Sequence, residues 1–281
     1  QPDFIWIKNR TDNVGHRIYD VNRGLGGTEE YLDSQATAES LVAGVGGVTD
    51  VDSNGFTVGA GNAHNGSGDN IVAWCWKAGG AAVSNTDGSI TSQVSANTDA
   101  GFSIVKYPGQ IATGQSGVDT VGHGLSAEPE LVIIKSLDLV GLWWAVYHKD
   151  ISQSGKYLRL NETSAQLTPS NSNDIWGNGM TSDVIGIGDS GGVNRDTSDY
   201  IAYCFHSVDG YQKVGTYEGN GSTTGPIQNI GFQPRFLMIK GYDIQRNWVI
   251  LDSVRGYGNN LSANTNLAEY LTSNNQGQEV D

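Results

Sequence analysis

Hydrophobic and polar residues alternate in short runs along this chain, and clusters of Gly, Asn and Ser separate the runs. The clearest run is Ile201-Ala202-Tyr203-Cys204-Phe205. Such alternation predicts β-strands joined by turns, as in an antiparallel β-sandwich. Apolar spacing typical of longer helices is missing, so we expect only two short helices, near residues 36–41 and 267–271.

One strand pattern occurs three times. A Pro, five mostly apolar residues and a Lys follow one another at Pro2–Lys8, Pro129–Lys135 and Pro234–Lys240. Each run predicts a strand buried on both faces, with the Pro at its start and the Lys where the chain reaches water. Further stretches recur downstream, namely Asp20…Arg23-Gly24 with Asp252…Arg255-Gly256, Ala38-Glu39 with Ala268-Glu269, and Ile71–Lys77 with Ile201–Ser207.

The repeats divide the chain into tandem antiparallel β-sandwich units. In a complete repeat an opening strand precedes the Pro-led strand, as Phe102–Tyr107 does and as its match Lys213–Tyr217 does, and a closing aromatic strand such as Ile201–Ser207 ends the unit. Residues 1–79 form a first repeat that lacks its opening strand, 80–100 a linker, 101–210 a complete repeat, and 211–281 a third repeat that lacks its closing strands. Unpaired strand edges are prone to association. We therefore expect the missing strands to come from further sequence or from a neighbouring subunit, and the chain to be a processed product or a segment of a longer polypeptide.

Composition and charge exclude several classes of protein. The formal net charge of −14 disfavours binding to phosphate backbones, and no apolar run approaches the ~18–20 residues of a membrane span. The 39 Gly residues fit a protein rich in turns. Two Cys are too few for a disulfide scaffold or a zinc cluster. Cys75 and Cys204 hold equivalent places in two repeats, so we expect one small buried residue per core and no disulfide.

Asp50, Asp52 and Asn54 are candidate metal ligands, because oxygen-bearing side chains at alternate positions before a Gly resemble the first half of a calcium loop. The twelfth position of such a loop falls on Gly61, which has no carboxylate. We interpret the segment as a turn between strands, with an opportunistic Ca²⁺ site as the alternative and no other cofactor. The pairs Asp20/Arg23 and Asp252/Arg255 are interpreted as exposed ion pairs, each stabilising by less than about 1 kcal/mol.

No catalytic constellation stands out, because none of the five His lies in a nucleophile elbow or a metal-binding spacing. We therefore predict a protein that is not an enzyme. Trp143 and Trp176 are candidate ligand-binding residues, since flat aromatic rings can stack on sugars, although the Trp side chains can equally fill the core. Trp143 adjoins Trp144, which aligns with Trp248 as a core residue, so Trp143 points to the opposite face of its strand.

Several stretches taken together resemble a tandem lectin-like repeat family found in virion and tail-fibre proteins of tailed bacteriophages, especially marine ones. They are Pro2–Lys8 with Asp20…Arg23-Gly24, Asn54-Gly55-Phe56 with Ile71–Lys77, Ser95–Val105, and Gly215–Ser222 with Gly231–Pro234. The resemblance covers nearly the whole chain and implies lectin-like β-sandwich repeats of the concanavalin or jelly-roll type, placed on a phage particle. It carries over no catalytic residue. The middle repeat lacks the Asp…Arg-Gly element, which suggests that this element is structural.

On this basis we expect a structural protein of the virion, located on the extracellular phage particle. It would be a tail-fibre or appendage adhesin that binds host-surface glycans. Its partners would be further copies of itself or other virion proteins, with no nucleic acid and no membrane insertion. The alternatives are a capsid-decoration or tail-assembly protein without a glycan site, and a polysaccharide depolymerase.

Overall fold

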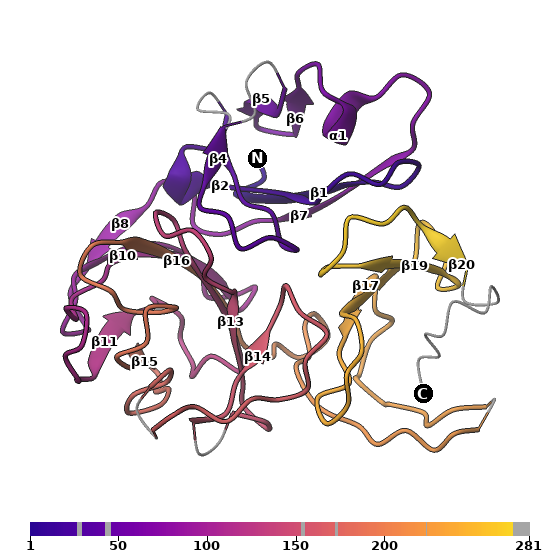
Figure 1. Cartoon of the computed structure of the whole chain (residues 1–281). Coiled ribbons are helices and arrows are strands. Elements are labelled where there is room, and N and C mark those ends of the chain that lie inside the picture. The colour runs from indigo at the N-terminus through magenta and orange to yellow at the C-terminus, as the bar shows by residue number, and fades with distance from the viewer. Residues whose placement is uncertain (27–29, 43–45, 153–154, 172–173, 223, 272–281) are drawn as a thin grey trace.

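The computed structural model describes residues 1–26, 30–42, 46–152, 155–171, 174–222 and 224–271. Its regular structure is almost entirely β, and the paired strands are antiparallel, which confirms the predicted all-β, sandwich-type fold. The described helices are two single turns, the 3-10 helix η1 (Val21–Arg23) and α1 (Asn62–Asn65). Figure 1 shows the strands gathered into sheets that surround a common centre.

Each of the three main sheets contains one Pro-led strand. The first sheet has the order β2 (Arg17–Asp20), β1 (Phe4–Asn9), β7 (Ile71–Trp76). The second has the order β14 (Leu158–Arg159), β13 (Ala145–His148), β12 (Leu131–Ser136), β16 (Asp199–Phe205), β10 (Phe102–Pro108), β9 (Ser92–Asn97), β8 (Val83–Asn85). The third has the order β17 (Phe236–Ile239), β18 (Val249–Asp252), β19 (Asn259–Ser262), β20 (Tyr270–Leu271).

Small two-stranded layers cover the outer faces of the first two main sheets. The hairpin of β5 (Val48–Asp52) and β6 (Gly55–Val58) packs with Ile5, Ile7 and Tyr19 of the first sheet. The pair β11 (Asp119–Gly122) and β15 (Val184–Ile187) closes a second core over the seven-stranded sheet. A further pair joins β3 (Glu30–Tyr31) to β4 (Leu41–Val42). The first and second repeats are therefore sandwiches of a main sheet and a small outer layer.

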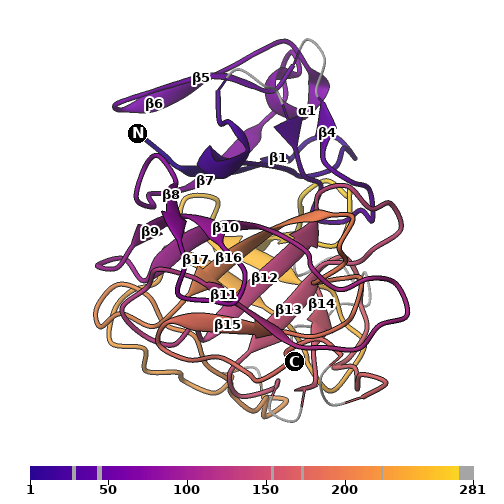
Figure 2. The ribbon, with the colours of Figure 1, turned by 90° about the vertical axis from the view of Figure 1, so that its left-hand side faces the viewer.

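The inner faces of all three main sheets share one hydrophobic core. Phe4 and Trp6 from the first sheet meet Ile133 and Trp144 from the second and Trp248 from the third. Figure 2 shows the first sheet lying across the other two. Burying a large apolar side chain stabilises a fold by about 1.5–3 kcal/mol, so this shared core makes the three repeats depend on one another.

Equivalent side chains tie each repeat to another one. His16, Trp144 and Trp248 each lie directly before the second strand of their sheet. Trp144 Nε1 donates to the carbonyl of Asp33 at 3.2 Å, and Trp248 Nε1 to that of Arg159 at 2.9 Å. His16 Nε2 lies 3.0 Å from the carbonyl of Ser262. The second repeat thus binds the first, the third binds the second, and the first binds the third, so the chain closes into a pseudo-threefold ring.

The Lys residues that follow the Pro-led strands do not reach water as predicted. Lys8 and Lys135 are fully buried, and Lys240 is partly buried. Their Nζ atoms donate to carbonyls of a neighbouring repeat, at 3.4 Å for Lys8 to Asn266, 3.4 Å for Lys135 to Thr37 and 3.1 Å for Lys240 to Thr163. Burial lowers the pKa of each Lys to about 8. These positions therefore join repeats rather than mark the surface.

Three further expectations need correction. Residues 80–100 are more than a linker, because β8 and β9 extend the seven-stranded sheet. Residues 36–41 and 267–271 form no helix and lead into β4 and β20 instead, since segments this short cannot offset the cost of helix nucleation. Both Cys are unpaired thiols as expected, but only Cys204 is buried. Cys75 is exposed on β7, which is an edge strand of the first sheet.

Candidate functional site

The chain turns a tight corner after β2 and again after β18, and each corner holds a buried ion pair. Arg23 Nε lies 2.6 Å from Asp20 Oδ2, and Arg255 Nε lies 2.5 Å from Asp252 Oδ2. Asp20 also caps η1 by accepting from the Arg23 amide, and Gly24 ends the turn with a φ of 95°, which favours Gly. All four charged side chains are at most 5% exposed, so the expectation of exposed ion pairs is wrong.

Each corner carboxylate also receives a hydrogen bond from the closing strand of another repeat. Tyr203 of β16 donates to Asp20 Oδ2 at 2.8 Å, and Trp74 Nε1 of β7 donates to Asp252 Oδ2 at 3.0 Å. Burial alone would raise the pKa of Asp252, but the hydrogen bonds from Arg255 and Trp74 hold it below its usual value. The corners therefore connect repeats that are far apart in the sequence.

The middle repeat departs from this arrangement. The strand register places His148 opposite Leu131, as Asp20 lies opposite Phe4 and Asp252 opposite Phe236. Three residues later the chain has the buried Ile151 where the other corners have Arg. Among the described residues no closing-strand aromatic donates to His148. This repeat thus lacks the Asp…Arg-Gly element, and the described residues include no third closing strand that would donate to such a corner.

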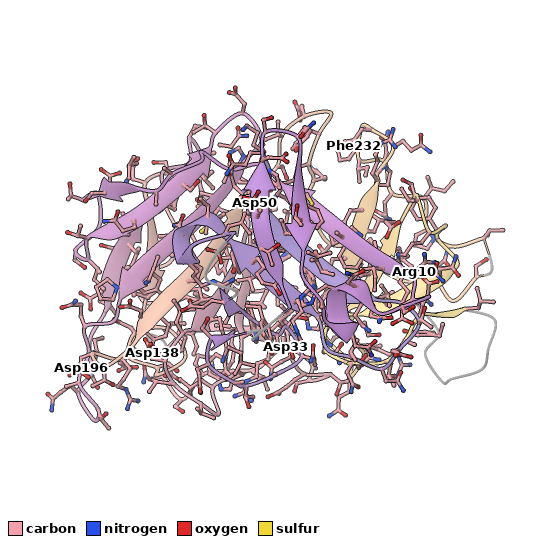
Figure 3. All side chains as sticks on the ribbon, turned by 90° about the horizontal axis from the view of Figure 1, so that it is seen from above. Arg10, Asp33, Asp50, Asp138, Asp196 and Phe232 are labelled. Carbon is pink, nitrogen blue, oxygen red and sulfur yellow. The ribbon has the colours of Figure 1, made fainter. Side chains whose placement is uncertain are left out.

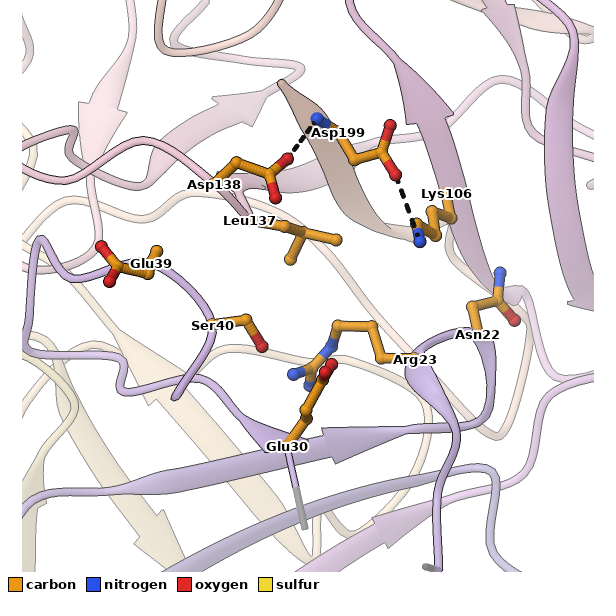
Figure 4. Close-up of a pocket in the computed structure, with 9 residues that line it drawn as sticks. All are labelled: Asn22, Arg23, Glu30, Glu39, Ser40, Lys106, Leu137, Asp138 and Asp199. Carbon is orange, nitrogen blue, oxygen red and sulfur yellow. Dashed lines mark hydrogen bonds and ion pairs between the residues drawn. The ribbon is translucent and has the colours of Figure 1, made fainter. Parts of the chain in front are cut away.

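A pocket of about 520 Å³ opens at the junction of the first and second repeats (Figure 4). The first repeat contributes its corner and the segment before β4, and the second contributes β10, β16 and the loop after β12. The lining residues are Asn22, Arg23, Glu30, Glu39, Ser40, Lys106, Leu137, Asp138 and Asp199. The lining is thus rich in carboxylates.

Part of the pocket lining is already paired. Lys106 Nζ lies 3.2 Å from Asp199 Oδ2, and the Asp199 amide donates to Asp138 Oδ2 at 2.6 Å. By contrast, three buried polar atoms of the lining have no hydrogen-bond partner among the described residues. They are Asn22 Oδ1, Glu39 Oε2 and Ser40 Oγ. Since buried polar groups are nearly always hydrogen-bonded, these three atoms point to a ligand.

At the equivalent junction between the third and first repeats, charged side chains occupy the matching place. Backbone bonds from Ser40 to Leu137 and from Glu269 to Arg10 show that these two pairs hold matching positions. At the second junction Glu269 lies 2.8 Å from Arg255 Nη1 and 2.7 Å from Arg10 Nη2. Figure 3 shows that Arg10, at this second junction, and Asp138, in the pocket, lie on opposite sides of the molecule. Ser40 and Leu137 at the first junction therefore leave open the space that the Glu269 ion pairs fill at the second.

The sequence-predicted candidates lie elsewhere. The Trp143 ring is only partly exposed, because it stacks on Tyr157 at 5.0 Å and lies under the Arg159 guanidinium at 4.5 Å. Trp176 is 2% exposed and donates to the Lys156 carbonyl at 3.0 Å. A binding role for Trp176 is thus corrected to a core role, since its ring has no open face.

The candidate metal ligands Asp50, Asp52 and Asn54 are exposed on the β5–β6 hairpin. Asp52 Oδ1 accepts from the Asn54 amide at 3.1 Å, which is a turn contact. No group of three or more His, Cys, Asp or Glu suited to a metal ion occurs in the part of the chain that the structure describes. The arrangement supports the interpretation as a turn.

The whole chain, residues 1–281, matches the model of a family described as a domain of unknown function, DUF7483. The chain belongs to this family. No curated protein and no solved structure matches it. None of the described helices has the length and apolar character needed to cross a membrane. In this DUF7483 chain, the pocket at the junction of the first and second repeats is the candidate ligand site.

Proposed function

We propose that this protein is a structural protein of a tailed-phage virion, a tail-fibre or appendage adhesin that binds host-surface glycans in the pocket between the first two repeats. The resemblance of its repeats to virion proteins supports the location. The observation that carries the binding function is the set of three buried, unpartnered atoms on Asn22, Glu39 and Ser40. An unsatisfied buried polar group costs about 1–3 kcal/mol, which the hydroxyl groups of a sugar would relieve.

The charge of the lining favours a neutral sugar or an amino sugar. Four carboxylates line the pocket, and its two cations are already engaged, Arg23 with Asp20 and Lys106 with Asp199. Carboxylates accept strong hydrogen bonds from hydroxyl and ammonium groups. An acidic sugar would bring a like charge close to them, which disfavours it.

A glycan array tests the proposal with three variants. Glu39→Ala removes one unpartnered atom, and Ser40→Glu copies Glu269 of the filled junction. We expect Glu39→Ala and Ser40→Glu each to weaken glycan binding at least tenfold, while their melting temperatures stay within a few degrees of the native value. Trp143→Ala is the matched control and should bind as the native protein does.

The results separate the alternatives. Loss of binding in Trp143→Ala together with full binding in Glu39→Ala would place the site at Trp143 and reject the pocket. If the native chain binds no glycan and no host cell, the adhesin proposal fails, and a capsid-decoration or tail-assembly role takes its place.

A depolymerase is the second candidate, because Asp138 and Asp199 both line the pocket and the Asp138 carboxylate accepts from the Asp199 amide. Glycoside hydrolysis uses a pair of carboxylates on either side of the bond that breaks. Incubation with the glycans that the array selects, followed by an assay for new reducing ends, tests this activity. An enzyme would lose it in Asp138→Asn and Asp199→Asn, whereas an adhesin releases no reducing ends at all.

A further inference from the structure

A closing strand lies in the middle of the sheet of the second repeat. β16 pairs along one edge with the Pro-led strand β12, from Leu131↔Phe205 to Ser136↔Tyr200. Along its other edge it pairs with the opening strand β10. In the first repeat, β7 takes the same place beside β1. Two of the three Pro-led strands are therefore covered by a closing strand on the edge away from their hairpin partner.

The third repeat has no such strand among the described residues. β17 pairs only with β18, and all four of its residues are partly exposed, whereas all six of β1 are buried. The opening-type stretch Lys213–Tyr217 forms no strand, and Figure 1 shows this part of the chain as an orange arm without arrows. Both neighbours of a closing strand are thus present while the strand between them is missing.

Exposed apolar side chains gather in the same repeat. Ten large apolar side chains are exposed among the described residues, and eight of them follow residue 210, namely Tyr211, Tyr217, Ile227, Ile244, Val254, Tyr257, Leu267 and Leu271. The third repeat therefore leaves more large apolar side chains exposed than the first two repeats do.

The shared core also has an unfilled position. Phe4 begins β1 and contacts Tyr203 of a closing strand at a ring distance of 4.8 Å. Phe236 begins β17 and contacts Trp74 of the other closing strand at 5.6 Å. Leu131 begins β12 in the equivalent position and stays partly exposed. An aromatic side chain on a third closing strand would cover it.

The edge of β17 is short and lies between Pro234-Arg235 and Lys240, but no side chain within the strand itself blocks pairing. Natural edge strands carry charges, Pro or bulges that block the addition of another strand. Phe236–Ile239 contains neither a charged residue nor a Pro. A bare apolar edge of this kind is the usual receptor for an added strand.

We propose that the free edge of β17 accepts an antiparallel strand from a partner polypeptide, with apolar or aromatic residues at alternate positions as in β7 and β16. These two strands define the occupant because they hold the same place in the other repeats. In them the inward residues are Val72, Trp74 and Trp76, and Ile201, Tyr203 and Phe205. A second copy of this chain cannot donate β7 or β16, since both are already paired.

The partner strand differs from β7 and β16 at one position. Its central aromatic residue would meet His148 instead of an Asp. His148 Nδ1 accepts from the Asp150 amide at 3.2 Å. The partner strand would thus meet an imidazole that already holds one hydrogen bond, where the other corners present a carboxylate.

A peptide with the sequence Asp199–His206, with Cys204→Ser and a solubilising Lys tag, tests the proposal on the full chain. We expect saturable binding, a higher melting temperature, and slower amide hydrogen exchange in β17 and in Lys213–Tyr217. The same peptide with an N-methyl group on Ile201 is the matched control, because the backbone of the odd-numbered residues of β16 faces the Pro-led strand and the methyl group removes a donor to that ladder. It should bind at least tenfold more weakly. A peptide of the opening strand, Phe102–Pro108, should leave the exchange of β17 unchanged.

Three results would overturn the proposal. The first is equal binding of the native peptide and the peptide N-methylated at Ile201. The second is protection confined to β7, which would mean that the peptide uses the other open edge. The third is a chain that forms dimers in light scattering with β17 already protected, since the occupant would then be a second copy.

Discussion

The two junctions made by the first repeat are built from the same backbone and differ in what fills them. Towards the third repeat, Glu269 bridges Arg10 and Arg255 and occupies the space. Towards the second repeat, Ser40 and Leu137 hold the matching positions and leave a pocket beside Arg23. The threefold ring thus keeps its scaffold while one junction serves stability and the other is open to a ligand.

The buried corner of the filled junction offers the largest effect. Asp252→Ala would leave Arg255 buried without its main partner and remove the acceptor of Trp74. Removing one partner of a buried ion pair destabilises by about 3–5 kcal/mol. Urea unfolding should show a loss of this size for Asp252→Ala and for Asp20→Ala, with a smaller loss for His148→Ala, whose corner has no ion pair. A loss below about 1 kcal/mol for Asp252→Ala would mean that the corner is not essential to the ring.

Opening the filled junction is the next test of the comparison. Glu269→Ser copies Ser40 and deprives Arg10 and Arg255 of their shared partner. We expect a loss of about 2 kcal/mol, because hydrogen bonds to charged groups contribute about 1.5–3 kcal/mol. The matching change Ser40→Glu in the pocket should alter the free energy of unfolding less. Equal effects in both variants would show that the two junctions are energetically alike.

How the sequence relates to this structure is clearest at the strands. The Pro-led runs and the closing strands were predictable, because alternation and recurrence are local properties of the chain. The shared core was not, since an inward Trp6 or Trp144 has the same pattern whether it fills its own repeat or a common centre. The burial of Lys8 depends on the carbonyl of Asn266, which no local pattern reveals.

The pocket could not be predicted from the sequence for a related reason. Sequence comparison aligns Glu39 with Glu269, whereas the backbone bonds to Leu137 and Arg10 make Ser40 the true counterpart of Glu269. A shift of one residue in a loop hides the change from Glu to Ser that creates the cavity. The signal was present in the repeats, but only the fold fixes the loop alignment.

Acid should weaken the filled junction and spare the open one. Trp6 Nε1 donates to His16 Nδ1 at 2.8 Å, so the neutral ring carries its proton on Nε2, towards the Ser262 carbonyl. Burial lowers the pKa of His16 to about 3. In the unfolded chain its pKa is 6.5. Between these values the unfolded state binds more protons, so this contribution to stability is complete above pH 6.5 and falls by about 1.4 kcal/mol per pH unit below it.

The measurement is urea unfolding of the native chain and His16→Gln at pH 7 and pH 5. Gln keeps a donor and an acceptor but does not titrate. The difference between the two pH values should be about 2 kcal/mol smaller in the variant. The same acid dependence in both proteins would show that His16 is not the group responsible.

Trp143 provides the smallest effect and the sharpest separation of stability from binding. Its ring packs on Tyr157 and Arg159, and the backbone of Gly192 runs so close that an added Cβ would lie 2.7 Å from the ring. An aromatic pair and a half-exposed cation–π contact each contribute about 0.5–1.5 kcal/mol. Trp143→Ala should therefore lose about 1–2 kcal/mol in urea unfolding and keep its glycan affinity, whereas Glu39→Ala should keep its stability and lose affinity. The reverse result would make the open junction a structural gap and Trp143 the binding residue.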